Sequence, residues 1–181
     1  MTAPVLLTER LLLRPLGPED AEAWYAFHAD SVTMRHLGGV QSRSVAWRGL
    51  CAMAGAWSIR GFSMFAVTLR DTGKWIGRVG PWQPEDWPGT EIGWGLASQF
   101  AGRGFAREAA TAAIDYAVDV LGWTDIIHTI APDNAESIAL AQRLGSTNRG
   151  RTTLPPPLES LPVDDWGQSA ADWRARRAGR G

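Results

Sequence analysis

The sequence contains little of what marks several large classes of protein. Its single cysteine, Cys51, excludes an internal disulfide and is typical of a protein from the reducing cytoplasm. It has no run of about 18 apolar residues, so no membrane-spanning helix is predicted. The formal net charge is −1, and without an excess of either sign we expect neither nucleic acid nor a membrane surface as a partner.

Two kinds of site are also missing from the pattern. The histidines, His28, His36 and His128, have no metal-ligand spacing with one another or with Cys51, so no metal is expected. Cys51 falls on an apolar helical face, which favours a core position over a nucleophile.

The first residues have no basic region ahead of their apolar run and reach Glu9 early, so we expect no signal peptide and a cytoplasmic location.

The chain is long enough for one globular domain with a sizeable core. It has 181 residues, of which 45% are hydrophobic and 20% charged, as in an ordinary globular protein. We expect a single domain over residues 1–181 with its core at about residues 5–150. The basic end of the chain, residues 168–181, is expected to be a partly flexible tail.

The most informative stretch runs from Glu91 to Leu121. Residues 91–100 form an apolar segment bounded by turn residues, which predicts a buried strand, and Gly102-Arg103-Gly104 follows as a flexible turn. Apolar residues then recur at helical spacing: Ala106, Ala109, Ala110, Ala113, Ile114, Ala117, Val118 and Leu121. A strand, a glycine turn and a helix in this order direct backbone N–H groups to one point at the positive end of the helix dipole. We therefore predict a phosphate-binding site there.

Two familiar phosphate motifs do not fit this turn. A P-loop requires Gly-Lys-Ser/Thr at the helix start, where this chain has Gly104-Phe105-Ala106. The dinucleotide fingerprint requires a third glycine, and Arg107 stands in that place.

The rest of the chain reads as further strands and helices around this stretch. Ser42 and Asn134 are expected to cap two of the helices, and Gly61 and Gly145 to end them. The expected strands are residues 8–16, 62–69, 74–80, 125–131 and 161–166, and the expected helices begin at Pro18, Arg43 and Ala135.

Three segments together resemble the GNAT family of acyltransferases. The opening TERLLLRP, residues 8–15, is similar to the first strand of its RimJ/RimL-like branch, the ribosomal-protein N-terminal acetyltransferases. PDNAES, residues 132–137, is similar to the family's Pro-x-Asn-x-x-Ser motif. The glycine turn is similar to Gln/Arg-x-x-Gly-x-Gly/Ala in two frames, Gln99 to Gly104 and Ala101 to Ala106. The second keeps the family's spacing to Trp94 and Leu96 and is preferred.

The resemblance implies a fold, a cosubstrate and a set of residues. The fold is α/β, a GNAT fold with a mixed, mostly antiparallel sheet of about six to seven strands, splayed at the central strand, and about four helices on its two faces. The cosubstrate is acetyl-CoA, from which an acetyl group passes directly to an amine. The residues that bind it are Trp94, Leu96, Gly102, Arg103, Gly104, Phe105, Ala106, Arg107 and Asn134.

The roles of the polar site residues have structural alternatives. By resemblance Ser137 protonates the leaving thiolate, because Ala141 stands where many relatives have tyrosine; Ser137 could instead bond its own helix. Asn134 holds the pantetheine arm, caps its helix, or does both. Glu91 is the first candidate for the base that accepts the amine proton, directly or through a water, with Glu85 and Asp86 second. The alternative is a solvated carboxylate, which is the favoured interpretation for Glu85 and Asp86.

The acceptor is a primary amine, either a peptide N-terminus or a small molecule, and the sequence does not choose between them. The residues after Arg149 either cover the site or mediate a homodimer. Two other functions stay open at this point: a CoA-binding module without turnover, and a nucleotide-binding protein that shares only the phosphate turn.

Overall fold

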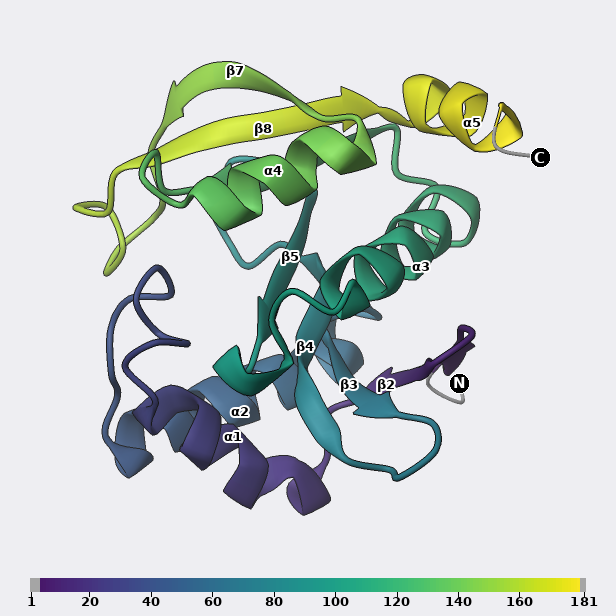
Figure 1. The fold of residues 1–181 in the computed structure, drawn as a ribbon. Coiled ribbons are helices and arrows are strands. Elements are labelled where there is room, and N and C mark those ends of the chain that lie inside the picture. The colour runs from purple at the N-terminus through teal and green to yellow at the C-terminus, as the bar shows by residue number, and fades with distance from the viewer. Residues whose placement is uncertain (1–3, 180–181) are drawn as a thin grey trace. The chain divides into compact units, whose positions relative to one another are not determined.

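The computed structural model describes residues 4–179, which form eight strands, five α-helices and two short 3-10 helices (Figure 1). The strands are β1 (Leu6–Leu7), β2 (Leu11–Pro15), β3 (Phe65–Leu69), β4 (Trp75–Trp82), β5 (Glu91–Leu96), β6 (Asp125–Ile130), β7 (Thr147–Thr152) and β8 (Val163–Ser169). The helices are η1 (Pro18–Asp20), α1 (Ala21–Ala29), α2 (Arg43–Arg60), η2 (Ser98–Phe100), α3 (Phe105–Asp119), α4 (Ala135–Leu144) and α5 (Ala170–Ala178). In this part of the chain no helix is both long and apolar enough to cross a membrane.

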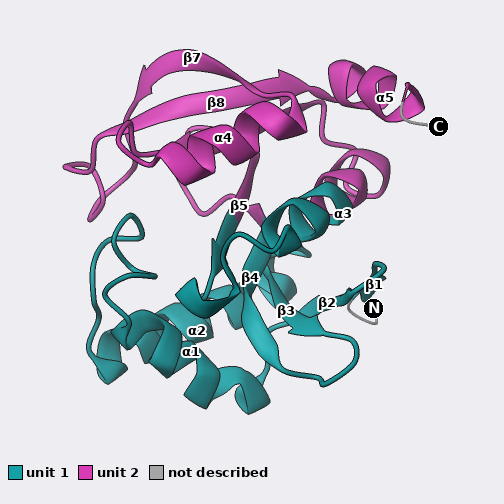
Figure 2. Ribbon diagram, in the orientation of Figure 1, with its two compact units in different colours: residues 1–80, 94–112 teal, residues 81–93, 113–181 magenta. Residues whose placement is uncertain are grey.

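The chain divides into two compact units, coloured separately in Figure 2. Unit 1 comprises residues 1–80 and 94–112, and unit 2 comprises residues 81–93 and 113–181. The strands follow the order β1-β2-β3-β4-β5-β6-β8-β7. Strands β4 and β5 and helix α3 each begin in one unit and end in the other.

Unit 1 is built on an antiparallel meander with alternating side chains. Leu11 and Leu13 of β2 are fully buried, as the period of two predicts, and β2 pairs with β3, which pairs with β4. Helix α1 contributes the buried rings of Trp24 and Phe27 to this core. The indole of Trp24 donates to the carbonyl of Ala46 at 2.7 Å, and the ring of Phe27 packs edge-on to Trp75.

A buried ion pair sets the passage from β2 into α1. Asp20 is 2% exposed and accepts two hydrogen bonds from the Arg14 guanidinium at 2.7 and 2.8 Å. It also accepts from the backbone N–H of Gly17 at 2.9 Å, closing the turn that Gly17-Pro18 was expected to open.

Unit 2 is built on β6, β8 and β7, which pair antiparallel in that order. Helix α4 packs on β6 and β8, and its ends are those the sequence predicts: Asn134 caps the start and Gly145, in the left-handed region with φ 103°, closes the end. The first residues of strand β5 belong to this unit and pair parallel to β6, with Glu91 opposite Ile127.

The observed elements exceed those predicted. The sequence indicates six to seven strands and about four helices, whereas the structure has eight strands and five α-helices over residues 4–179. Strand β7, TNRGRT, was missed because it is polar and almost wholly exposed, so no apolar pattern marks it.

Helix α5 was also missed, in the stretch that was expected to be a partly flexible tail. Ser169 caps it by accepting from the N–H of Asp172, and Trp173, 1% exposed, donates its indole N–H to Asp115 at 2.8 Å. Residues 168–178 thus form the end of β8 and a helix anchored by one buried ring, while residues 180–181 of the expected tail lie outside the described residues.

The expectation for Cys51 was wrong. Its side chain lies on the exposed side of α2, and the buried residues of that helix are Ala46, Leu50 and Met53. The helix carries apolar residues on more than one face, so periodicity did not separate the buried from the exposed positions.

Candidate active site

The predicted phosphate turn lies within unit 1, between η2 and α3. Gly102 and Gly104 have φ of 72° and 80°, a left-handed conformation that glycine adopts without steric penalty. Helix α3 begins at Phe105, and its first helical bond runs from the N–H of Glu108 to the carbonyl of Gly104. In the described part of the chain, the backbone N–H groups of residues 102–107 have no hydrogen-bond acceptor.

We call these six residues, 102–107, the cradle. Unpaired N–H groups at the N-terminus of a 15-residue helix form a site for an anion, because the helix dipole adds to the N–H partial charges. The cradle is exposed apart from Phe105, which is 4% exposed, and Ala106, which is half-buried. An anion can therefore reach it from solvent.

The end of β5 that carries Trp94 and Leu96 is tightly packed in unit 1. A Cβ added to Gly77 of β4 would lie 2.3 Å from the carbonyl oxygen of Gly95, so only glycine permits this approach. Gly95 in turn leaves room for Phe27 and Leu37, each 3.1 Å from where its Cβ would be.

Glu91 lies at the start of β5, in unit 2, and is 7% exposed. Its carboxylate accepts the indole N–H of Trp87 at 2.5 Å, the hydroxyl of Thr129 at 2.9 Å and the backbone N–H of Thr129 at 3.3 Å. The side chain therefore ties the loop before β5 to strand β6. Glu85 and Asp86, the second candidates for the base, are exposed in that loop, and Asp86 has a φ of 60°.

Asn134 and Ser137 lie at the start of α4, also in unit 2. The Asn134 side chain accepts the N–H of Ser137 at 3.1 Å, which confirms the capping role of Asn134. Ser137 is half-buried. Ala141, where many relatives have tyrosine, is fully buried. The predicted site residues thus fall in two groups, Trp94, Leu96 and the cradle in unit 1, and Glu91, Asn134 and Ser137 in unit 2.

The chain was compared with known families and structures. A family model described as an acetyltransferase (GNAT) domain matches residues 10–147, more than half of the chain. The chain belongs to the GNAT acetyltransferase family. It is accordingly an acyltransferase enzyme, and the family resemblance of the three sequence segments is confirmed.

This GNAT acetyltransferase is similar to proteins that cover nearly its whole length. It is 30% identical to the uncharacterized N-acetyltransferase p20 of Bacillus licheniformis, over 80% of this chain and 83% of that one. An acetyltransferase structure from Agrobacterium tumefaciens has a TM-score of 0.82 at 30% identity, covering 93% of this chain and 95% of the other. The ribosomal-protein-S5-alanine acetyltransferase of Vibrio fischeri has a TM-score of 0.72 at 18% identity, over 94% and 98%, and so shares the fold.

Sequence reasoning missed a group of polar contacts that holds the start of η2, the short helix before the cradle, in unit 1. Asp30, in the turn after α1, accepts the hydroxyls of Thr33 and Ser98, and the Thr33 hydroxyl accepts the N–H of Ser98 at 2.9 Å. The Thr33 bond, with that of Ser98, lowers the pKa of the Asp30 carboxyl to about 2. An aspartate just after a helix with a threonine three residues on is a turn signal that could have indicated it.

A buried chain of side chains in unit 2 was missed as well. The Nδ1–H of His128 donates to the carbonyl of Ile92 at 2.7 Å, and its Nε2 accepts the hydroxyl of Ser146 at 3.1 Å. The Ser146 hydroxyl oxygen also accepts from the side-chain amide of Gln168. A histidine inside an apolar strand pattern was the only sequence signal.

None of the predicted site residues lines the cavity of this GNAT acetyltransferase. It measures about 610 Å³ and lies within unit 2, among residues of β7, β8 and α5 that include Arg149, Gln168 and Arg176. Over residues 4–179 no group of three histidine, cysteine, aspartate or glutamate side chains is arranged to hold a metal ion.

Proposed function

We propose that this enzyme takes its acetyl group from acetyl-CoA and binds the diphosphate of that cosubstrate on the cradle, residues 102–107. One observation carries the proposal: six consecutive backbone N–H groups without an acceptor in the described chain, at the start of a long helix. Family members use acetyl-CoA, and its diphosphate supplies the anion that such a turn accepts.

The acetyl group passes directly to an amine in this proposal. The amine nitrogen attacks the thioester carbonyl, a C–N bond forms, and the C–S bond breaks. Backbone N–H groups around Trp94 to Leu96 donate to the developing oxyanion. Glu91 accepts the amine proton through a water, and the hydroxyl of Ser137 donates a proton to the departing sulfur and regains one from solvent.

The contacts of Glu91 bear on this role in two ways. Three donors, from Trp87 and Thr129, hold in place the carboxylate that would accept the proton. The same contacts occupy both oxygens, so a relayed water, rather than direct contact with the amine, is the route we propose.

For the acceptor we propose a primary amine, with a peptide N-terminus ahead of a small molecule. The RimJ/RimL-like opening favours a protein α-amine. An α-amine is also easier to deprotonate before attack, because it titrates near ~8 and a lysine amine near ~10.4. An α-amine therefore needs less help from a base such as Glu91.

The test is release of free CoA thiol from acetyl-CoA in the presence of peptide N-termini, polyamines or aminoglycosides. We expect turnover with at least one amine class, and the largest kcat/KM with a peptide. Ser137→Ala is expected to lower kcat by about a hundredfold. Ser58→Ala, at an exposed serine of α2, is the matched control and should leave kcat unchanged. Full activity of Ser137→Ala would remove the acid assignment.

Direct transfer needs its own test because Cys51 is exposed and could accept an acetyl group. We expect Cys51→Ser to retain full turnover and the wild-type enzyme to show sequential rather than ping-pong kinetics. Loss of activity in Cys51→Ser together with ping-pong kinetics would replace direct transfer with a covalent route.

A further inference from the structure

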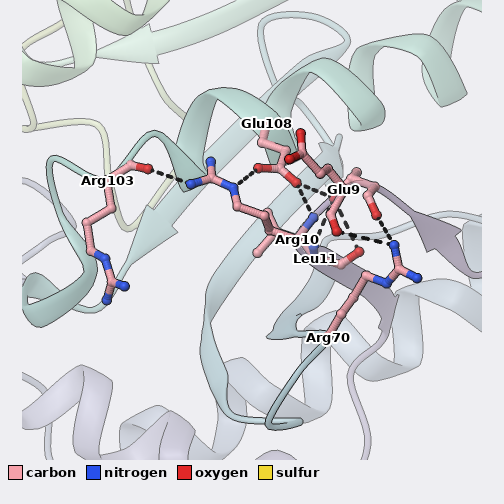
Figure 3. A network of polar contacts seen from close by, with 7 residues as sticks. Glu9, Arg10, Leu11, Arg70, Arg103 and Glu108 are labelled. Carbon is pink, nitrogen blue, oxygen red and sulfur yellow. Dashed lines mark hydrogen bonds and ion pairs between the residues drawn. The ribbon is translucent and has the colours of Figure 1, made fainter.

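An arginine of the N-terminal segment holds both the cradle and the helix residue that follows it. Arg10 precedes β2, and its guanidinium donates to the carbonyl of Arg103 at 3.0 Å and to the carboxylate of Glu108 at 2.7 Å (Figure 3). Arg103 is in the glycine turn, and Glu108 is in the first turn of α3. One side chain thus joins the turn to the helix that follows it, and all three residues belong to unit 1.

Glu108 is bound from the same segment by two further groups. Its Oε1 accepts the backbone N–H of Arg10 at 2.8 Å and the hydroxyl of Thr8 at 2.6 Å. Burial alone raises the pKa of the Glu108 carboxyl, but the bonds from Thr8 and Arg10 outweigh it and the pKa is lowered. Glu108 is therefore ionised at neutral pH and its bonds with Arg10 are charge-assisted.

The guanidinium also lies against the side chains of the turn. It is 4.5 Å from the centre of the Phe105 ring, and a Cβ on Gly104 would be 3.4 Å from its Nη2. Arg10 therefore contacts the cradle through the carbonyl of Arg103 and the ring of Phe105, and contacts the helix just after the cradle through the carboxylate of Glu108.

The bond to the Arg103 carbonyl has a geometric consequence. In a trans peptide the C=O and the following N–H point in opposite directions. Holding the Arg103 carbonyl toward Arg10 therefore directs the N–H of Gly104 away from Arg10. Glycines on both sides of Arg103 leave this peptide plane free to rotate in the absence of such a bond.

We propose that Arg10 is a positioning residue that orients the cradle peptides for the diphosphate, with Glu108 holding Arg10 in place. This inference rests on the proposed function, since it assumes that the cradle binds the cosubstrate. Arg10 is not a phosphate ligand itself, because its charge is matched by Glu108 at 2.7 Å.

The test compares Arg10→Met with two donors, acetyl-CoA and S-acetylpantetheine, which lacks the diphosphate. We expect KM for acetyl-CoA to rise about tenfold while kcat changes by less than about twofold. A rise of this size corresponds to the loss of one charge-assisted hydrogen bond, and kcat is nearly unchanged because the bond stabilises the bound substrate and the transition state equally. The kcat/KM for S-acetylpantetheine should be unchanged. If Arg10 had a purely structural role, Arg10→Met would lower kcat/KM equally for acetyl-CoA and S-acetylpantetheine.

Arg70→Met is the matched control. Arg70 anchors the same N-terminal segment by donating to the carbonyls of Thr8 at 2.6 Å and Glu9 at 3.3 Å, and no contact joins it to the cradle in Figure 3. We expect this variant to lose some stability and to keep the wild-type KM for acetyl-CoA. An equal rise in KM for Arg70→Met would show that general loosening, not orientation of the cradle, is responsible.

Glu108→Gln separates positioning from direct contact. It keeps an oxygen for Thr8 and the Arg10 backbone but releases the Arg10 charge. If Arg10 positions the cradle, KM for acetyl-CoA rises; if Arg10 binds phosphate directly, KM falls, and the proposal is overturned. Should Arg10→Met not fold, Arg10→Lys serves instead, because one ammonium cannot hold both the Arg103 carbonyl and Glu108 in the fork geometry.

The outcomes distinguish this inference from the proposed function. A wild-type enzyme that neither binds CoA nor uses acetyl-CoA overturns the proposed function. A wild-type enzyme that uses acetyl-CoA, with the same KM in Arg10→Met, overturns only the role of Arg10.

Discussion

His128 connects three parts of unit 2 through one imidazole. It is 1% exposed, and its two ring nitrogens bind the carbonyl of Ile92 and the hydroxyl of Ser146. Burial, opposed by the bond to Ile92 and assisted by the charge of Arg149, lowers the pKa of His128 to about 4 from its ordinary 6.5. The ring is therefore neutral in the folded protein at neutral pH.

This pKa predicts how stability depends on pH. The unfolded chain binds a proton at His128 near pH 6.5, while the folded chain resists it down to about 4. The folded protein is therefore not destabilised by this group above pH 6.5. Its stability falls as the pH drops from 6.5 toward about 4, and the total loss is about 3 kcal/mol at ~1.36 kcal/mol per pKa unit.

The measurement is the free energy of unfolding against pH for wild type and His128→Asn. The variant keeps a donor near Ile92, is less stable at neutral pH, and should show a shallower loss of stability between pH 6.5 and about 4. His28, whose pKa burial also lowers to about 4, is present in both proteins and cancels. Parallel curves would contradict the assignment to His128.

Glu91→Gln tests the base at the same scale. A protonated amine needs a base most at low pH, so we expect the variant to lose turnover most on the acid side of the pH–rate profile. Glu85→Gln, at an exposed loop residue, should keep the wild-type profile. A Glu91→Gln profile of unchanged shape would assign this carboxylate to structure alone, as a partner of Trp87 and Thr129.

At the scale of elements, helix α3 and its preceding turn followed from sequence. The helix runs from Phe105 to Asp119, and five of its residues are fully buried: Ala109, Ala110, Ala113, Ile114 and Ala117. The periodicity predicts these positions because one face of the helix is apolar and small.

The chain offers a matched pair of glycines to test the turn. Gly102 and Gly122 have φ of 72° and 71°, and a Cβ at either would meet nothing within 4 Å. Alanine at either site costs about 1–2 kcal/mol of backbone strain. We expect only Gly102→Ala to raise KM for acetyl-CoA, measured in steady-state assays. Equal effects of both variants on KM would mean that strain, not the cradle, governs binding.

Elements without an apolar pattern were beyond prediction. The strand β7 is made of polar residues and is paired through backbone bonds with β8, whose register supplies the structure that the sequence does not signal. Helix α5 depends on two buried residues, Ala170 and Trp173, and on ion pairs of Arg177 with aspartates about 60 positions earlier, Asp115 and Asp119. Such distant partners are invisible to local periodicity.

At the scale of the whole molecule, ligand binding should appear as stability. A ligand that binds only the folded enzyme adds about 2.7 kcal/mol to the free energy of unfolding when its free concentration is about 100 times its Kd. We expect CoA to raise the melting temperature and ATP at the same concentration to do so far less. A larger shift with ATP would indicate a nucleotide site that shares only the phosphate turn.

Local chemistry of the chain was sufficient for the segments that carry the family: the capped starts of α2 and α4, the buried alternation of β2, and the glycine turn before α3. Each depends on residues within a few positions of one another, where propensity and backbone geometry act. Only the folded protein decided that Glu91 is enclosed by Trp87 and Thr129, that Cys51 is exposed, and that Arg10 meets Glu108. Those arrangements join residues that are distant in the chain, or depend on what covers a helix, and packing alone determines them.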